Sequence, residues 1–193
     1  MTLEMPVLET PRLRVRPFGL DDLEAAHQLL DHEAWQTAVT RAERTRWLQW
    51  SALNFEQLAL LSQPPYGDRA VVLKATDEVV GAVGLVPAYG PFGTLPGFDV
   101  PPTSEAVFQF TPEMGLFWAT RTAHRRQGYA AEAAQALIDY AFAEMRLRRL
   151  VATTEHDNLG SQAVMRRLGM RLERNPHAEP HWFQVVGVLE NRR

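Results

Sequence analysis

The stretch Arg125-Arg126-Gln127-Gly128-Tyr129-Ala130 decides the fold, because it joins a strand-like run ending near Thr120 to an alanine-rich helix beginning near Ala130. The first N–H groups of a helix have no partners within it and carry the positive end of its dipole, so an anion can bind there. Gly128 lets the backbone approach such an anion closely, and the small Ala130 leaves the helix entrance open. The stretch has neither a P-loop Gly-Lys-Ser/Thr nor the three glycines of a dinucleotide fingerprint, so it indicates either a tight turn or a phosphate-binding loop.

Strands and helices are predicted to alternate on both sides of this junction. Strands are predicted at 13–16, 69–75, 79–87, 105–120, 149–155, 170–174 and 182–190, and helices at about 20–31, 130–146 and 159–168. A further helix begins at the capping box Thr40-Arg41-Ala42-Glu43 and is stopped by Pro64-Pro65. Its apolar residues recur at helical spacing and predict a buried face: Leu48, Ala52, Phe55 and Ala59.

The order of these elements, βααβββαβαββ, predicts one mixed α/β sheet in a single domain over residues 1–193. Gly169 follows the helix at 159–168 and is expected to end it with a positive φ. Residues 88–104 are rich in proline, glycine and apolar side chains, and they predict an inserted loop with a functional role.

Composition excludes several classes of protein. The 193 residues are 46% hydrophobic and 22% charged, which is typical of a globular chain that buries a real core. No apolar run is long enough to span a bilayer, and the first residues lack a signal peptide's apolar stretch, so we expect a cytoplasmic protein that does not bind membranes. The absence of cysteine excludes a disulfide framework and a thiolate nucleophile.

The charge is unevenly distributed. Residues 1–120 carry 8 basic and 15 acidic side chains, whereas residues 121–174 carry 10 arginines and 6 acids, a net charge of +4. A local basic block in an acidic chain indicates either a site for a polyanionic ligand or a solvated arginine face, and it does not favour nucleic acid. No metal is expected, because Pro176 and Pro180 prevent the pair His177 and His181 from sharing a helix.

Three motifs in order resemble the GCN5-related N-acetyltransferase (GNAT) family. Arg125-x-x-Gly128-x-Ala130 is similar to its acetyl-CoA-binding motif, and Asn158-x-x-Ser161 followed by Arg167-Leu168-Gly169-Met170 is similar to a second signature. The opening run from Leu8 to Arg16 resembles the ribosomal-protein N-terminal acetyltransferase (RimJ/RimL-type) branch. The family usually has lysine at 167 and phenylalanine at 170, and residues 88–104 are an insertion.

The resemblance implies a mostly antiparallel mixed sheet in which two parallel strands, at about 113–120 and 149–155, splay apart. Acetyl-CoA is the implied co-substrate, with its pantetheine against the backbone of Trp118 and Thr120 and its diphosphate on N–H groups of the 125–130 stretch. The residues implied to bind it are Trp118, Thr120, Arg125, Arg126, Gln127, Gly128, Tyr129, Ala130, Asn158, Ser161 and Arg167. Asn158 and Ser161 also fit an ordinary helix cap and first turn.

The implied reaction is direct attack of an amine on the thioester in a ternary complex, which requires a base, an oxyanion donor and a proton for the departing thiolate. Glu113 is the first candidate base, although a glutamate at a strand edge is as often merely exposed. Glu155 and His156 are alternatives at the end of the following strand, and Ser161 is the candidate proton donor.

The acceptor implied by the family is a primary amine, on a protein N-terminus or a small molecule, and the enzyme is expected to be a monomer or a homodimer. Aromatic residues could line its pocket or belong to the core: Trp35, Trp47, Trp50, Tyr89, Phe92 and Phe98. The acidic first 120 residues suit a cationic acceptor. The alternatives are a non-catalytic acyl-CoA-binding module of the same fold and, less favoured, a nucleic-acid-binding protein.

Overall fold

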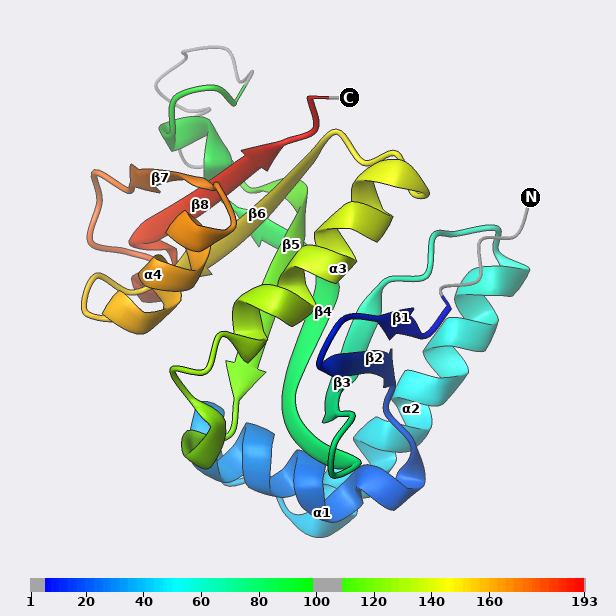
Figure 1. Cartoon of the computed structure of the whole chain (residues 1–193). Helices are drawn as coiled ribbons and strands as arrows, with labels where there is room; N and C mark the ends of the chain where they lie inside the picture. The colour runs from blue at the N-terminus through cyan, green and yellow to red at the C-terminus, as the bar shows by residue number, and fades with distance from the viewer. Residues whose placement is uncertain (1–5, 99–108, 193) are drawn as a thin grey trace. The chain divides into compact units, whose positions relative to one another are not determined.

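The computed structural model describes residues 6–98 and 109–192, so the predictions that fall on residues 99–108 lie outside it (Figure 1). The strands are β1 (Leu8–Glu9), β2 (Leu13–Pro17), β3 (Gly67–Leu73), β4 (Glu78–Gly90), β5 (Thr111–Thr120), β6 (Arg149–Thr154), β7 (Arg171–Arg174) and β8 (Val185–Glu190). The α-helices are α1 (Leu23–Ala26), α2 (Arg41–Leu60), α3 (Tyr129–Ala143) and α4 (Leu159–Arg167). The π-helix η2 (His27–Ala34) and the short 3-10 helices η1 (Leu20–Asp22), η3 (Phe92–Thr94), η5 (Thr122–His124) and η6 (His181–Phe183) complete the chain.

The strands pair into a sheet in the order β1-β2-β3-β4-β5-β6-β8-β7. The pairs β1–β2, β2–β3, β3–β4, β6–β8 and β7–β8 are antiparallel. Strands β5 and β6 run parallel, with Gly115 opposite Val151. A Cβ at Gly115 would lie 3.0 Å from the carbonyl oxygen of Val86, which explains the glycine by the close passage of β4. The predicted mixed, mostly antiparallel sheet with a parallel pair is confirmed.

Contacts divide the chain into two compact units, each assembled from two separate stretches of sequence. The first unit comprises Met1–Leu85 and Phe117–Arg146, and the second comprises Val86–Leu116 and Leu147–Arg193. Strands β4 and β5 therefore each contribute residues to both units.

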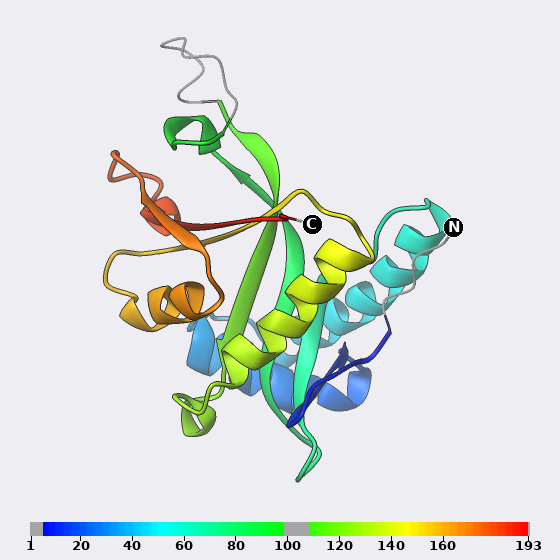
Figure 2. The same cartoon turned by 45° about the horizontal axis from the view of Figure 1, so that its top comes forward.

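In the first unit, the helices α1, η2 and α2 pack against one face of the strands. Their shared core contains Phe18, Ala26, Leu29, Leu30, Leu48, Ala70, Val72, Val79, Ala82 and Ala119. Helix α3 lies over the opposite face of these strands (Figures 1 and 2). Ala134, Leu137 and Ala141 of α3 are fully buried, so these side chains of the helix lie on its packed face.

The buried face of α2 differs from the prediction. Leu48 is buried as expected, but Ala52 is exposed, and Ser51 and Leu58 are buried in its place. The stripe is rotated because Arg44, one turn before Leu48, is itself buried through an ion pair. A prediction from hydrophobic residues alone treats Arg44 and Ser51 as solvent-facing. It therefore centres the buried face on the side of Ala52 and not on the side of Ser51.

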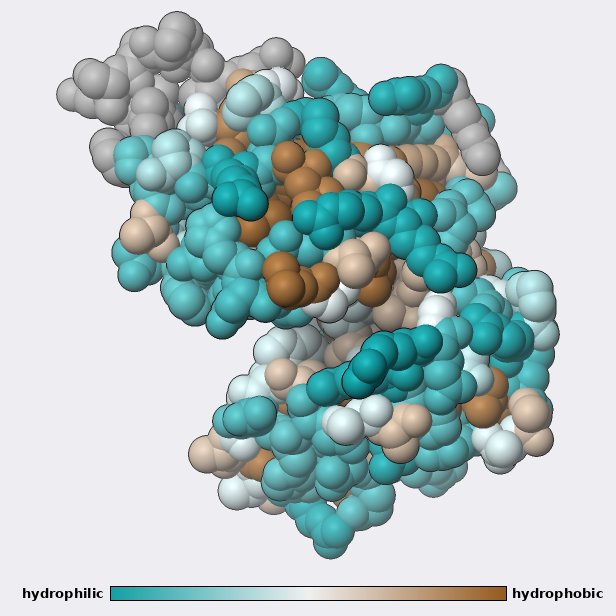
Figure 3. Space-filling view, turned by 60° about the vertical axis from the view of Figure 1, so that its left-hand side comes forward, coloured by the Kyte–Doolittle hydropathy of each residue, from teal (hydrophilic) through white to brown (hydrophobic). Residues whose placement is uncertain are grey.

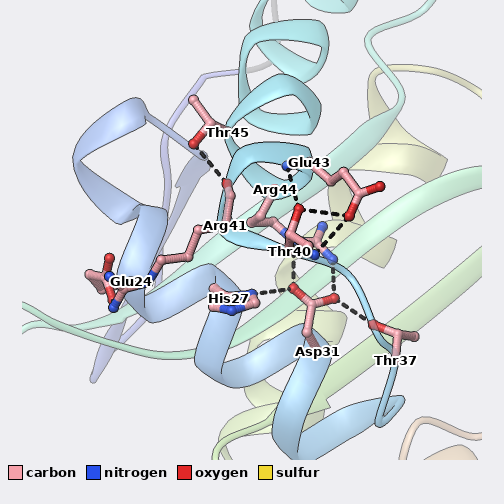
Figure 4. A network of polar contacts seen from close by, with 9 residues as sticks. All are labelled: Glu24, His27, Asp31, Thr37, Thr40, Arg41, Glu43, Arg44 and Thr45. Atoms are coloured by element: carbon pink, nitrogen blue, oxygen red, sulfur yellow. Dashed lines mark hydrogen bonds and ion pairs between the residues drawn. The ribbon is translucent and has the colours of Figure 1, made fainter.

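A buried carboxylate fastens η2 to the start of α2 (Figure 4). Asp31 accepts hydrogen bonds from Arg44 Nε at 2.9 Å, from His27 Nδ1 at 2.8 Å and from Thr37 Oγ1 at 2.7 Å. Burial alone would raise the pKa of Asp31, but these donors lower it from 3.8 to about 2. The predicted capping box follows directly, with the Glu43 N–H donating to Thr40 Oγ1 and the Thr40 N–H donating to the Glu43 carboxylate.

The second unit has an aromatic core over strands β6 and β8. Its buried members are Phe92, Leu95, Phe98, Val151, Phe183, Val186 and Val188. The rings of Phe92 and Phe98 stack at 5.1 Å, and Phe183 meets Phe92 edge-on at 5.0 Å. The segment from residue 88 is therefore no plain loop, because β4 continues to Gly90 and η3 then supplies core residues.

Gly169 ends α4 as predicted, with φ +77. The Met170 N–H donates to the Met165 carbonyl and the Gly169 N–H donates to the Arg166 carbonyl, both at 3.0 Å. These two bonds form a Schellman motif, which a residue with a positive φ at this position makes possible.

The face of the molecule in Figure 3 is largely hydrophilic, with hydrophobic side chains in separate patches. Among the described residues, none of the helices combines the length and the apolar character that crossing a membrane requires.

Candidate functional site

The loop before α3 forms a cradle of backbone N–H groups in the first unit. Arg126 and Gly128 both have left-handed backbone, with φ 61 and φ 84, and α3 begins at Tyr129, one residue earlier than predicted. Within residues 6–98 and 109–192, the N–H groups from Arg126 to Ala130 find no hydrogen-bond acceptor. Successive N–H groups in such a turn, together with the head of a 15-residue helix, are an arrangement that can bind an anion.

The loop of this cradle is held by Arg12, the residue before β2. Its Nη1 donates to the carbonyl oxygen of Gln127 at 3.0 Å, and its Nε and Nη2 reach the Glu132 carboxylate at 2.7 and 2.6 Å. Its guanidinium lies 4.5 Å from the centre of the Tyr129 ring. Thr10 Oγ1 also donates to Glu132, at 2.6 Å. In the sequence, the Thr10–Arg14 run is notable only for its resemblance to the family. Its contacts with residues some 120 positions later in the chain give the run a structural role.

Burial would raise the pKa of Glu132, but the hydrogen bonds from Thr10 and Arg12 lower it, so this carboxylate is ionised beside the cradle. An acidic residue in the first turn of α3 also interacts favourably with the helix dipole.

Arg125 anchors the entrance of the loop. Its Nε donates to the carbonyl oxygen of Thr120 at 3.3 Å, and its Nη2 donates to the carbonyl oxygen of Glu33 at 3.2 Å. The carboxylate of Glu33 in turn accepts the N–H of Thr122. The π-helix η2 thus fastens the loop at two points, which no sequence pattern indicates. The side chains of Arg126 and Gln127 are exposed, and Trp118 and Thr120 are half-buried on β5.

In the second unit, the turn between β6 and α4 is fixed by polar contacts. Asn158 is the N-cap of α4, since its Oδ1 accepts the N–H of Ser161 at 3.0 Å. Buried Gln162, which the sequence does not mark, donates to the carbonyl oxygens of Glu155 at 3.4 Å and His156 at 2.9 Å. The N–H of His156 donates to Gln184 Oε1 at 2.9 Å. The side chain of Glu155 and the Ser161 residue are partly accessible, and His156 and Arg167 are exposed.

The carboxylate of Glu113 is fully engaged. Arg149 binds both of its oxygens, through Nε at 3.1 Å and through Nη2. The same guanidinium donates to the carbonyl oxygen of Gly97 and lies 4.1 Å from the centre of the Phe98 ring. Burial would lower the pKa of Arg149, but hydrogen bonding to Glu113 raises it, so the pair is ionic. A role in joining β5 to β6 and the η3 segment accounts for Glu113 without catalysis.

Nothing in the sequence marks Asp68 of β3, yet its environment is unusual. The residue lies opposite Gly84 of β4, where a Cβ would lie 2.3 Å from the Phe117 ring. Burial raises the pKa of Asp68 from 3.8 to about 6, an effect that the charge of Arg44 partly offsets. A carboxyl group of this kind exchanges protons near neutral pH.

The aromatic residues considered for an acceptor pocket separate into two groups. Phe92 and Phe98 belong to the core of the second unit, and Trp47 packs against Phe18 and Arg44. Trp35, Trp50 and Tyr89 are exposed, and Trp35 lies 6.0 Å from Phe117. In the part of the chain that the structure describes, three or more His, Cys, Asp or Glu residues nowhere gather as a metal site would require.

Comparison with known proteins gives consistent matches along most of the chain. Residues 12–171 match the family described as "Acetyltransferase (GNAT) domain". The chain is 30% identical over 187 residues to the uncharacterized N-acetyltransferase YjdG of Bacillus subtilis (strain 168), covering 94% of this chain and 99% of that protein.

Solved structures share the fold. An acetyltransferase from Agrobacterium tumefaciens str. C58 superposes with a TM-score of 0.69 at 24% identity, covering 98% of this chain and 97% of that one. RimL, a ribosomal L7/L12 alpha-N-protein acetyltransferase in complex with coenzyme A, superposes with a TM-score of 0.62 at 18% identity, covering 95% and 96%.

Proposed function

The chain belongs to the GNAT acetyltransferase family, and from that premise we propose that it transfers the acetyl group of acetyl-CoA to a primary amine. The observation that carries the proposal is the cradle at residues 126–130, where N–H groups without acceptors in the described chain lie at the head of a long helix. A diphosphate supplies the acceptors that these groups lack. We further propose that both units act as one acetyltransferase domain, because the family match draws on residues of each.

We propose that the diphosphate binds the N–H groups of Arg126, Gln127, Gly128 and Ala130, with Arg125 and Tyr129 shaping the loop. In the first unit, pantetheine is assigned to the backbone of Trp118 and Thr120. In the second unit, Asn158 and Arg167 stay candidate ligands of coenzyme A that the family resemblance implies. The free N–H donors of the loop and the exposed guanidinium of Arg167 fit the negative charge of such a ligand.

The chemistry needs a neutral amine, because an ammonium group has no lone pair to attack with. Glu113, Glu155 and His156 are the candidate bases. We place Glu155 first, since both oxygens of Glu113 are engaged by Arg149, whereas Glu155 receives only a 3.3 Å hydrogen bond from Thr154. Ser161 is the proposed proton donor to the thiolate of coenzyme A, which leaves as the thiol, and the proton that the base takes from the amine replaces the one that Ser161 gives up.

The proposed acceptor is an amine on a protein N-terminus or on a small molecule. RimL acts on a ribosomal protein, and the acidic first 120 residues of this chain suit a cationic acceptor. A panel of peptide N-termini, polyamines, amino acids and aminoglycosides, with thiol release as the signal, tests the class of acceptor. Binding of coenzyme A without turnover on any amine would instead indicate an acyl-CoA-binding module.

Calorimetric titration with coenzyme A tests the cradle directly. Replacing Gly128, whose φ is 84, with valine strains the loop and crowds its N–H groups, so Gly128→Val should raise the Kd by about 100-fold, the equivalent of two charge-assisted hydrogen bonds. Gly169→Val is the matched control, because Gly169 has a similar φ of 77 but lies at the end of α4. Equal losses of affinity in the two variants would contradict the proposal that the diphosphate binds in the cradle.

A further inference from the structure

The contacts of Arg12 connect the cradle to the first turn of α3. Its guanidinium donates to the carbonyl oxygen of Gln127 and pairs with Glu132, while its plane covers the Tyr129 ring. The Arg12 N–H adds a second contact to Glu132, at 3.0 Å. Arg12, the residue before β2, therefore touches the loop before α3 and two residues in the first turn of the helix, Tyr129 and Glu132.

The geometry of the peptide bond gives the Gln127 contact a consequence. The carbonyl of Gln127 and the N–H of Gly128 belong to one planar trans unit, so they point in opposite directions. A hydrogen bond from Arg12 that holds the carbonyl toward β2 turns the Gly128 N–H the other way. Gly128, which follows this unit, is left-handed, and so is Arg126, which precedes Gln127. As a glycine, Gly128 has more backbone conformations open to it than other residues, so a hydrogen bond that fixes the preceding carbonyl restricts it.

The charge of Arg12 has a second consequence. The ionised carboxylate of Glu132 lies in the first turn of α3, where it would repel a diphosphate at the helix head. Pairing with Arg12 at 2.6 Å cancels that charge locally. The Arg12 side chain thus orients the Gly128 N–H toward the ligand and weakens the repulsion between Glu132 and the diphosphate.

We infer that Arg12 is a positioning residue for the diphosphate of acetyl-CoA, acting through the Gln127–Gly128 peptide and through Glu132. The inference rests on the proposed function, because it assumes that the cradle holds a diphosphate. It adds a role for the Thr10–Arg14 run that sequence alone leaves undefined.

The test compares two ligands on each variant: coenzyme A, and pantetheine, which lacks the diphosphate. Arg12→Ala should raise the Kd of coenzyme A about tenfold, or about 1.4 kcal/mol, and leave the Kd of pantetheine unchanged. Arg14→Ala is the matched control two residues further along the chain, since Arg14 pairs with exposed Asp77 at 2.8 Å, and it should change neither Kd. In Arg12→Ala/Glu132→Gln, part of the lost affinity should return because the unpaired carboxylate is gone.

Because both ligands are titrated into one preparation, the ratio of their Kd values does not depend on the fraction of folded protein. An Arg12→Ala variant that keeps the wild-type ratio would overturn the positioning role while leaving the cradle in place. A wild-type protein that binds coenzyme A and pantetheine equally would overturn the cradle, and with it both proposals.

Discussion

Single buried polar residues hold several elements of this fold together, and Asp31 is the clearest case. It is 1% exposed and receives donors from η2, from the following turn and from α2. The carboxylate by itself would contribute little to the stability of the fold, because removing its charge from water costs free energy. Its stabilising effect comes from the partners that would otherwise be buried without a counter-charge.

Asp31→Asn should lower the free energy of unfolding at pH 7 by about 3 kcal/mol, because it leaves the Arg44 guanidinium buried and unpaired. The folded pKa of Asp31 is about 2 and its ordinary value is 3.8, so the charged form stabilises the fold above about pH 4. That contribution, about 2 kcal/mol, disappears as the pH falls toward 2.

Urea denaturation of wild type and variant from pH 7 to pH 3 measures this effect. The difference in unfolding free energy should narrow below pH 4. Asp77→Asn is the control, since the Asp77 side chain is 75% exposed in its pair with Arg14 and should change stability by less than about 1 kcal/mol. A difference between wild type and Asp31→Asn that stays constant over this range would contradict the assigned pKa.

Glu113 and Glu155 are expected to respond differently to the same substitution. Glu113→Gln should lower the unfolding free energy by about 2 kcal/mol through its pair with Arg149, and change kcat by less than about tenfold. Glu155→Gln should lower kcat by about 100-fold with little change in stability. Thermal melting and turnover on the acceptor found by the panel distinguish them, and the reverse pattern would restore Glu113 as the base.

At the scale of elements, α2 depends on its first turn. The helix has 20 residues, but its buried stripe is narrow and its first residues are exposed. The capping box at Thr40 and Glu43 therefore carries much of the local stability at this end.

Thr40→Ala should lower the unfolding free energy by about 1 kcal/mol, because the Glu43 N–H loses Thr40 Oγ1 as its acceptor. Thr45→Ala is the control, since Thr45 donates only to the Arg41 carbonyl within the helix, and alanine has the higher helix propensity. Urea denaturation compares them, and equal losses would show that the cap is not the cause.

The elements that the sequence predicts best are those with local signals. The Thr40–Glu43 box and Gly169 mark helix ends that the structure places within a residue or two, and the strands predicted at 69–75 and 79–87 correspond to β3 and β4. The loop at residues 125–130 is likewise recognisable from its glycine and the helix that follows.

What the sequence could not predict depends on partners distant in the chain. Arg44 and Gln162 are polar, and only a counter-charge or a pair of carbonyls from another element makes their burial favourable. Arg12 is 120 residues from Glu132, and no periodicity relates them. The aromatic residues after Gly90 looked like loop residues because proline and glycine surround them, yet Phe92 is fully buried.

At the scale of the whole molecule, charge is separated along the chain. Eight of the ten arginines in residues 121–174 are exposed, and the other two, Arg121 and Arg149, form ion pairs. A ligand with three phosphates should therefore gain long-range attraction beyond its contacts with the cradle.

The affinity for coenzyme A should fall about tenfold as salt rises from about 0.1 to about 1 M, because the screening length falls from about 10 to about 3 Å. Pantetheine, which carries no phosphate, should bind equally at both concentrations. Calorimetry measures both affinities. An affinity for coenzyme A that is independent of salt would show that the arginines of residues 121–174 form a solvated surface with no role in attracting the ligand.

The discontinuity of the two compact units has a consequence for synthesis. Every residue of the first unit has left the ribosome once Arg146 has emerged, whereas the second unit still lacks its last 47 residues, Leu147–Arg193. Domains generally fold as units in the order in which they are made. The nascent chain is thus expected to complete its helix-rich part while Val86–Leu116 waits for the C-terminal strands that finish the aromatic core.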